Sequence, residues 1–210
     1  MDKAMSGTRV AATGTARGFT LIELMVTLVI AASLITLAVP GMRTTLKNGE
    51  LASTANDMIR SLQLARAEAV KRQRAVVFCA STNPLAAIPT CAIGAQVGWV
   101  VFQDNLGNQQ VDPGGTDPII ERHDLVNTDI TLHGDGNGLQ SYTALGFALP
   151  PTAGYVPTRN ILICDSRGNH QVGTQSTARA VLISATGRAR VSSLYTDTVT
   201  TQAAIGSSCP

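Results

Sequence analysis

A run of 21 residues with almost no charge, from Phe19 to Val39, constrains this 210-residue chain more than any other segment. Glu23 is its only ionisable side chain. An α-helix rises about 1.5 Å per residue, so the run spans roughly 32 Å, close to the hydrocarbon thickness of a bilayer. A helix that is apolar on every side lies either in a membrane or deeply packed against partners. The basic residues in front of this run favour the membrane.

The leader of residues 1–18 carries one acid and three basic residues, Lys3, Arg9 and Arg17. The apolar run that follows is too long for the central region of a secretory signal, and no small-x-small cleavage site comes after it. Positively charged flanks stay in the cytoplasm, so the rest of the chain is expected to cross the membrane. We therefore expect a single-pass protein with its membrane helix at 19–40.

The segment Gly18-Phe19-Thr20-Leu21-Ile22-Glu23 resembles the prepilin motif of type IV pilins and type II secretion pseudopilins. The resemblance implies cleavage between Gly18 and Phe19 by a prepilin peptidase, followed by N-methylation of Phe19. It also implies that Glu23 pairs with the freed N-terminal amine of a neighbouring subunit during filament assembly. A carboxylate inside a membrane helix costs on the order of 2–3 kcal/mol, which by itself marks a functional residue. The alternative is a glutamate that reaches the membrane interface.

Apolar residues recur at helical spacing over residues 41–74, which predicts an amphipathic helix with one buried stripe. Pro40 and Gly41 are expected to kink or locally melt the helix where it leaves the bilayer. We therefore expect one long helix over 19–74, with its second half packed on a sheet. The expected stripe comprises Leu51, Ala55, Met58, Ile59, Leu62, Ala65 (or Arg66), Ala69 and Val70.

From residue 75 onward, short β-branched or aromatic runs alternate with turn-forming clusters, which predicts antiparallel strands. Together with the helix, these strands predict an α+β fold with an antiparallel β domain at 75–210. The sheet is expected to be covered on one face by the helix and on the other by a second sheet. The tail from Ser192 to Pro210 has little apolar content and is expected to be loosely ordered. The strand-forming runs are 75–79, 97–102, 119–120, 130–132, 161–164 and 180–184.

Four cysteines in a chain delivered outside the cytoplasm are candidates for disulfides. Of the three possible connectivities we favour the one that joins Cys79 to Cys91 and Cys164 to Cys209. The first bond would connect a strand end to a nearby loop, and the second would hold the tail. A zinc site is the alternative, but the chain has no C-x-x-C or H-x-x-H spacing. We expect no metal and no cofactor.

Residues that could perform catalysis or bind calcium are sparse. The segments 104–108 and 133–138 contain Asp, Asn and Gly but lack the order of an EF-hand loop, so they are expected to be turns. His123, Asp124 and Ser141 contain the residue types of a catalytic triad, yet nothing in their spacing supports one. We therefore expect that the protein is not an enzyme.

Two arginines near the C-terminus are candidate ligand-binding residues. Gly187 is expected to form a turn, after which Arg188 and Arg190 point to the same face of an extended segment, about 6.7 Å apart. Two planar guanidinium groups side by side suit adjacent phosphates. Arg179 and Arg167 are expected to enlarge this patch. The alternative is that the arginines are ordinary solubilising charge.

The Gly187-Arg188-Ala189-Arg190 element resembles the GspH/FimT family of minor pilins and pseudopilins, as do Cys79 and the segments 98–104 and 163–165. The resemblance implies a type IV pilin-like fold. Within the family, this element is similar to the DNA-binding motif of FimT-type minor pilins, which capture DNA during natural transformation (competence). The chain is thus expected in the bacterial inner membrane with a periplasmic domain, and in a pilus filament after assembly.

Its expected partners are other pilin subunits and DNA, bound with modest affinity and without sequence preference because few cations are available. Two alternatives stay open. One is a minor pseudopilin of a type II secretion system. The other is an assembly-priming minor pilin that does not bind DNA and whose arginines contact other subunits.

Overall fold

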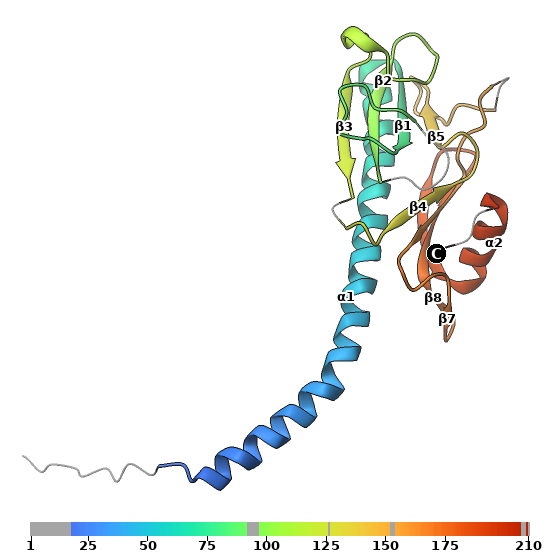
Figure 1. The fold of residues 1–210 in the computed structure, drawn as a ribbon. Helices are drawn as coiled ribbons and strands as arrows, with labels where there is room; N and C mark the ends of the chain where they lie inside the picture. Colours follow the sequence, from blue (N-terminus) through green and yellow to red (C-terminus); the bar gives the residue numbers. More distant parts are fainter. Residues whose placement is uncertain (1–17, 92–96, 126, 152–153, 207–208, 210) are drawn as a thin grey trace, which may run out of the picture. The chain divides into compact units, whose positions relative to one another are not determined.

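A computed structural model describes residues 18–91, 97–125, 127–151, 154–206 and 209, so the predicted leader lies outside the described residues apart from Gly18. Within these ranges the chain forms a long helix, a series of short strands and a second, short helix (Figure 1). The elements are α1 (Leu21–Arg72), β1 (Ala75–Ser81), β2 (Gly98–Asp104), the 3-10 turn η1 (Pro113–Gly115), β3 (Ile119–Asp124), β4 (Thr131–Gly134), β5 (Leu139–Tyr142), β6 (Asn160–Cys164), β7 (Gln171–Val172), β8 (Gln175–Ile183), β9 (Ala189–Leu194) and α2 (Tyr195–Ile205).

The chain divides into two compact units with the boundary after Thr44, and the described part of the first unit is mainly the first portion of α1. The backbone amide of Glu23 donates a hydrogen bond to Thr20 Oγ1 at 3.2 Å, so the Thr20 side chain caps the start of the helix. Large apolar side chains are exposed along this portion, and α1 is the one described helix that is long and apolar enough to cross a membrane. The backbone remains helical at Pro40 and Gly41, so the predicted local melting does not occur.

Residues 45–210 form the second unit, which contains two antiparallel sheets. The first sheet has four strands in the order β3-β2-β1-β5. In the second sheet β4 pairs with β6 and β6 with β8, while β7 and β9 each pair with β8. Among the described strands β9 pairs only with β8, so it is an edge strand.

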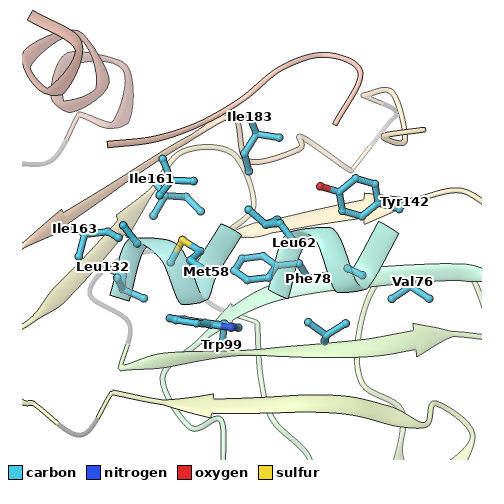
Figure 2. Close-up of a cluster of buried hydrophobic side chains, with 14 of the residues drawn as sticks. Met58, Leu62, Val76, Phe78, Trp99, Leu132, Tyr142, Ile161, Ile163 and Ile183 are labelled. Carbon is cyan, nitrogen blue, oxygen red and sulfur yellow. The ribbon is translucent and has the colours of Figure 1, made fainter. Parts of the chain in front are cut away.

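The buried stripe of α1 contributes to a core that it shares with both sheets. Figure 2 shows Met58 between Trp99 of the first sheet and Ile161 of the second. The indole nitrogen of Trp99 donates a hydrogen bond to Ser61 Oγ on α1 at 2.9 Å. Val70 is 45% exposed and lies outside the stripe, contrary to the prediction. The predicted stripe residues that are fully buried are Leu51, Ala55, Met58, Leu62, Ala65 and Ala69.

The outer faces of the two sheets, which do not contact α1, are covered by different elements. On the first sheet, Val77 and its neighbours pack against Val111 and Tyr155 from connecting segments. On the second sheet, Leu162 belongs to a cluster against which Ile205 of α2 packs. The predicted second sheet is present and shares the core with α1 and the first sheet, but it does not cover the opposite face of the first sheet. Connecting segments cover that outer face, and α2 covers the outer face of the second sheet.

The C-terminal tail is ordered, contrary to the prediction, since its described residues include the end of β9 and all of α2. The buried residues of α2 are Thr198 and Thr201. The helix ends at Gly206, whose left-handed backbone (φ 69°) lets its amide donate a hydrogen bond to the carbonyl of Gln202 at 3.1 Å. This capped helix is held on the sheet by a disulfide that follows it.

The structure contains the two disulfides favoured from the sequence. Cys79 in β1 is bonded to Cys91, and Cys164 in β6 is bonded to Cys209 beyond α2. The second bond closes a separation of 45 residues and fixes the end of the chain to the centre of the second sheet. Both bonds therefore connect a buried strand to a cysteine outside the named helices and strands.

Candidate functional site

The candidate site is built around the tight turn that connects β8 to β9. The amide of Gly187 donates a hydrogen bond to the carbonyl of Ser184 at 2.9 Å, and the amide of Ser184 donates one to the carbonyl of Arg188 at 2.9 Å. Gly187 has φ 81°, a left-handed conformation that glycine adopts without strain. The sequence prediction of a turn at Gly187 is confirmed.

The turn is fixed to the core through Tyr142 of β5. The Tyr142 hydroxyl donates a hydrogen bond to the carbonyl of Gly187 at 3.0 Å. Burial raises the pKa of Tyr142, so its hydroxyl stays a neutral donor at physiological pH. A Cβ atom added to Gly187 would lie 2.6 Å from Cε1 of the Tyr142 ring. The turn therefore sits on the core at a closeness that requires glycine.

Arg188 and Arg190 are both exposed and lie two residues apart at the start of β9. Both residues border one hollow, which agrees with the expectation that they share a face of an extended segment. Nη1 of Arg190 lies 3.3 Å from Oδ2 of Asp197 in α2, yet the Arg190 side chain remains 63% exposed. The guanidinium of Arg188 has no hydrogen-bond or ion-pair partner among the described residues.

Arg179 and Arg167 do not join this pair, contrary to the prediction. Arg190 lies opposite Leu182 of β8, whereas Arg179 is three residues before Leu182 and so points to the other face of the sheet. The Arg179 side chain donates hydrogen bonds to the carbonyls of Ser176 and Ala178, and burial lowers its pKa. Arg167 is paired with Asp165, with Nη2 and Oδ2 2.7 Å apart. Both arginines serve local structure.

A third arginine, Arg159, takes the place that was predicted for these two. It lies just before β6, and its Nη1 donates a hydrogen bond to the carbonyl of Ser184 at 2.6 Å. Arg159, Arg188 and Arg190 line one hollow of about 590 Å³, which we call the arginine hollow. Its remaining lining residues are Asn160, Leu182, Ile183, Ser184, Thr186 and Ala189.

The arginine hollow is positive and has no acidic lining residue. Two carboxylates bonded to lining residues of the hollow are already engaged. Asp135 accepts hydrogen bonds from the amides of Arg159 and Asn160 at 2.6 and 2.9 Å. Asp197 is engaged with Arg190, and its pKa is lowered by a hydrogen bond with Ser192 and by the nearby Arg190. A hollow of this kind suits an anion such as phosphate.

The remaining candidates from the sequence have structural environments. Ser141 lies in β5 and His123 in β3, and two strands separate them, so these two members of the hypothetical triad are at least roughly 14 Å apart in the sheet. The carboxylate of Asp104 accepts hydrogen bonds from the amides of Gly107 and Gln109, which shapes a turn. Within the described ranges, no cluster of His, Cys, Asp or Glu side chains could hold a metal ion.

In the first unit, Phe19 is 82% exposed and Glu23 lies in the first turn of α1. Among the described residues no hydrogen bond or ion pair involves the Glu23 carboxylate, and its amide makes the capping bond to Thr20. The two residues of the predicted cleavage junction, Gly18 and Phe19, precede the helix and have no regular secondary structure. Their roles in processing and assembly stay predictions.

Comparison with known proteins places the chain in a family. The family model described as type II transport protein GspH matches residues 54–187, and the model of the prokaryotic N-terminal methylation motif matches residues 14–39. No curated protein matches the chain. Two crystal structures of the Pseudomonas aeruginosa type IV minor pilin FimU are similar to it. The first has 23% identity and a TM-score of 0.48 over 69% of this chain and 89% of FimU. The second has 22% identity and a TM-score of 0.44 over 67% and 91%. Since the GspH model covers more than half of the chain and the methylation motif precedes it, the chain belongs to the GspH/FimT family of type IV pilin-like proteins.

Proposed function

We propose that this chain is a minor subunit of a type IV pilus that binds DNA through Arg188 and Arg190. The observation that carries the proposal is the arginine hollow, in which these two exposed guanidinium groups and Arg159 surround a space without acidic lining. Guanidinium groups bind phosphate oxygens through charge-assisted hydrogen bonds, and phosphates are the regularly repeated anions of DNA. Because the hollow offers no evident means to read bases, we propose binding without sequence preference.

The same proposal includes the anchoring and assembly of the subunit. A prepilin peptidase would cleave after Gly18, Phe19 would be N-methylated, and the apolar part of α1 would hold the chain in the bacterial inner membrane. The second unit would then lie in the periplasm, where its disulfides can form. Glu23 would pair with the amine of a neighbouring subunit as the chain enters a filament. The match to the methylation motif and the exposed apolar side chains of α1 support this sequence of events.

A second candidate function is that of a minor pseudopilin in a type II secretion system. The description of the matching family, a type II transport protein, favours it. In that case Arg188 and Arg190 would contact acidic surfaces of other subunits rather than DNA.

DNA titration separates these functions. The full-length chain in non-ionic detergent is titrated against a fluorescent DNA duplex at several salt concentrations, followed by anisotropy. We expect micromolar binding that weakens with salt and is lost in the double variant Arg188→Ala/Arg190→Ala. The matched control is Arg60→Ala/Arg74→Ala, which removes two exposed arginines on or next to α1 and should bind like the wild type. Absence of binding by the folded wild type would refute the proposal and favour the secretion function.

A further inference from the structure

A second, smaller hollow adjoins the same turn. It measures about 170 Å³ and is lined by Arg66 and two other residues of α1, together with the segment Gly187–Ala189. We call it the helix-side hollow. Arg188 lines both this hollow and the arginine hollow, so the two spaces share one guanidinium group.

The surroundings of Arg66 leave its charge available. The side chain is half-buried, and its guanidinium has no hydrogen-bond or ion-pair partner among the described residues. It lies against Gly146, where an added Cβ would be 3.6 Å from Arg66 Nε. A guanidinium carries five N–H donors, and a partly buried one without an acceptor gains more from an anion than a fully exposed one does.

Neither hollow contains an acidic lining residue. Their neutral polar side chains, such as Gln63 and Thr186, can donate hydrogen bonds to an anion. Four arginines from α1, the segment before β6 and β9 therefore surround one turn: Arg66, Arg159, Arg188 and Arg190. Arginines that only make a surface soluble have no reason to gather around one turn from three parts of the chain.

We propose that the two hollows bind successive phosphates of one DNA strand, with Arg159 and Arg190 on one phosphate, Arg66 on the next, and Arg188 between them. This inference rests on the proposed function and assigns to it two residues, Arg66 and Arg159, that lie outside the Gly-Arg-x-Arg element. It makes the preferred ligand a polyanion with neighbouring phosphates. A single phosphate could occupy only one of the hollows.

The salt dependence of binding measures the number of phosphates engaged. Each neutralised phosphate contributes about 0.7 to 0.9 to the slope of log affinity against log salt. Arg66→Gln should therefore reduce the magnitude of the slope by about that amount and weaken binding roughly three- to tenfold at low salt. Arg60→Gln is the matched control, because Arg60 is exposed on the same helix and lines neither hollow. It should leave the slope unchanged.

Two further variants keep the test decisive. Arg66→Lys retains the charge and should preserve the slope, which distinguishes loss of a phosphate contact from a disturbance of the turn near Gly146. Arg159→Gln should also lower the slope, through the other hollow. If Arg66→Gln and Arg159→Gln bind DNA with the wild-type slope while Arg188→Ala/Arg190→Ala does not bind, the two-hollow arrangement is wrong and the proposed function stands. If the wild type itself does not bind, the proposed function fails first.

Discussion

Replacing Gly187 with alanine tests whether the arginine-bearing turn depends on its contact with the core. Two effects add in this variant. A side chain at φ 81° occupies the left-handed region, which costs roughly 1–2 kcal/mol. The new Cβ would also lie 2.6 Å from Cε1 of Tyr142 and 3.3 Å from Cβ of Ala148, so a buried ring must move. Overpacking of this kind costs about 1–3 kcal/mol.

Gly173→Ala is the matched control for the backbone effect alone. Gly173 has φ 64° in the turn between β7 and β8, and an added Cβ meets nothing within 4 Å. We expect Gly173→Ala to lower the free energy of unfolding by about 1–2 kcal/mol and Gly187→Ala by about 2–5 kcal/mol. In a unit of this size, 1 kcal/mol corresponds to roughly 2–4 °C in melting temperature.

The assay is thermal unfolding of the full-length chain in non-ionic detergent, monitored by tryptophan fluorescence. Trp99 is the single tryptophan and is fully buried in the core that the sheets share with α1, so its emission reports unfolding of that core. DNA binding, measured below the melting transition, should weaken in Gly187→Ala because the backbone of Arg188 shifts with the turn. Equal melting temperatures for the two alanine variants would refute the reasoning, since they would show that the Tyr142 ring yields without cost.

Three other perturbations have expected outcomes. Arg72 and Lys71 hold the pKa of Glu68 below its ordinary value of 4.5. When folding lowers the pKa of a carboxyl group, its ionised form stabilises the fold above pH 4.5, and this stabilisation is lost as the pH falls through the folded-state pKa. Glu68→Gln should therefore lower the free energy of unfolding at neutral pH, measured by urea unfolding. The difference in this free energy between wild type and variant should shrink in acid, and a difference that does not change with pH would contradict this. Cys164→Ser/Cys209→Ser should cost about 2–4 kcal/mol and speed amide hydrogen exchange in α2, whereas unchanged exchange would show that packing alone holds the helix. Glu23→Ala should abolish incorporation into filaments while leaving the melting temperature of the second unit unchanged, and normal incorporation, scored by immunoblotting of sheared pili, would exclude the pairing role.

The parts of the fold that depend on local periodicity could be predicted from the sequence. The apolar spacing of the second half of α1 predicted its buried face well, except at Val70, close to the exposed end of the helix. The order of the C-terminal tail could not be predicted in this way. The buried face of α2 consists of Thr198 and Thr201, residues with neither strong helix propensity nor clear apolar character. Strand β5 was missed for the same reason, since its buried residues include the polar Gln140 and Ser141.

The candidate site shows what a single sequence can and cannot supply. The pairing of Arg188 and Arg190 was predicted from strand alternation, a local rule, and in the structure both residues line the arginine hollow. Whether a distant arginine joins the pair depends on strand register. The register puts Arg179 on the opposite face and places Arg159 beside Ser184 instead. Helical spacing placed Arg66 only as an alternative to Ala65 on the buried stripe of α1. Its relation to the turn could not be predicted, because it arises only when β5 and the β8–β9 connection pack against the helix.

Because β9 lies at the edge of its sheet, the arginines also affect whether the subunit associates with itself. An edge strand presents unpaired backbone amides and carbonyls that can pair with the edge of another molecule, and charged side chains on such a strand oppose this pairing. Arg188 lies just before this strand and Arg190 is its second residue, so two exposed guanidinium groups protect the edge from self-association at the high local concentrations in a membrane or a filament. Alanine at both positions removes this protection. Lysine at both positions keeps the charge but loses the planar guanidinium groups, so the lysine variant separates weaker phosphate binding from aggregation of the subunit.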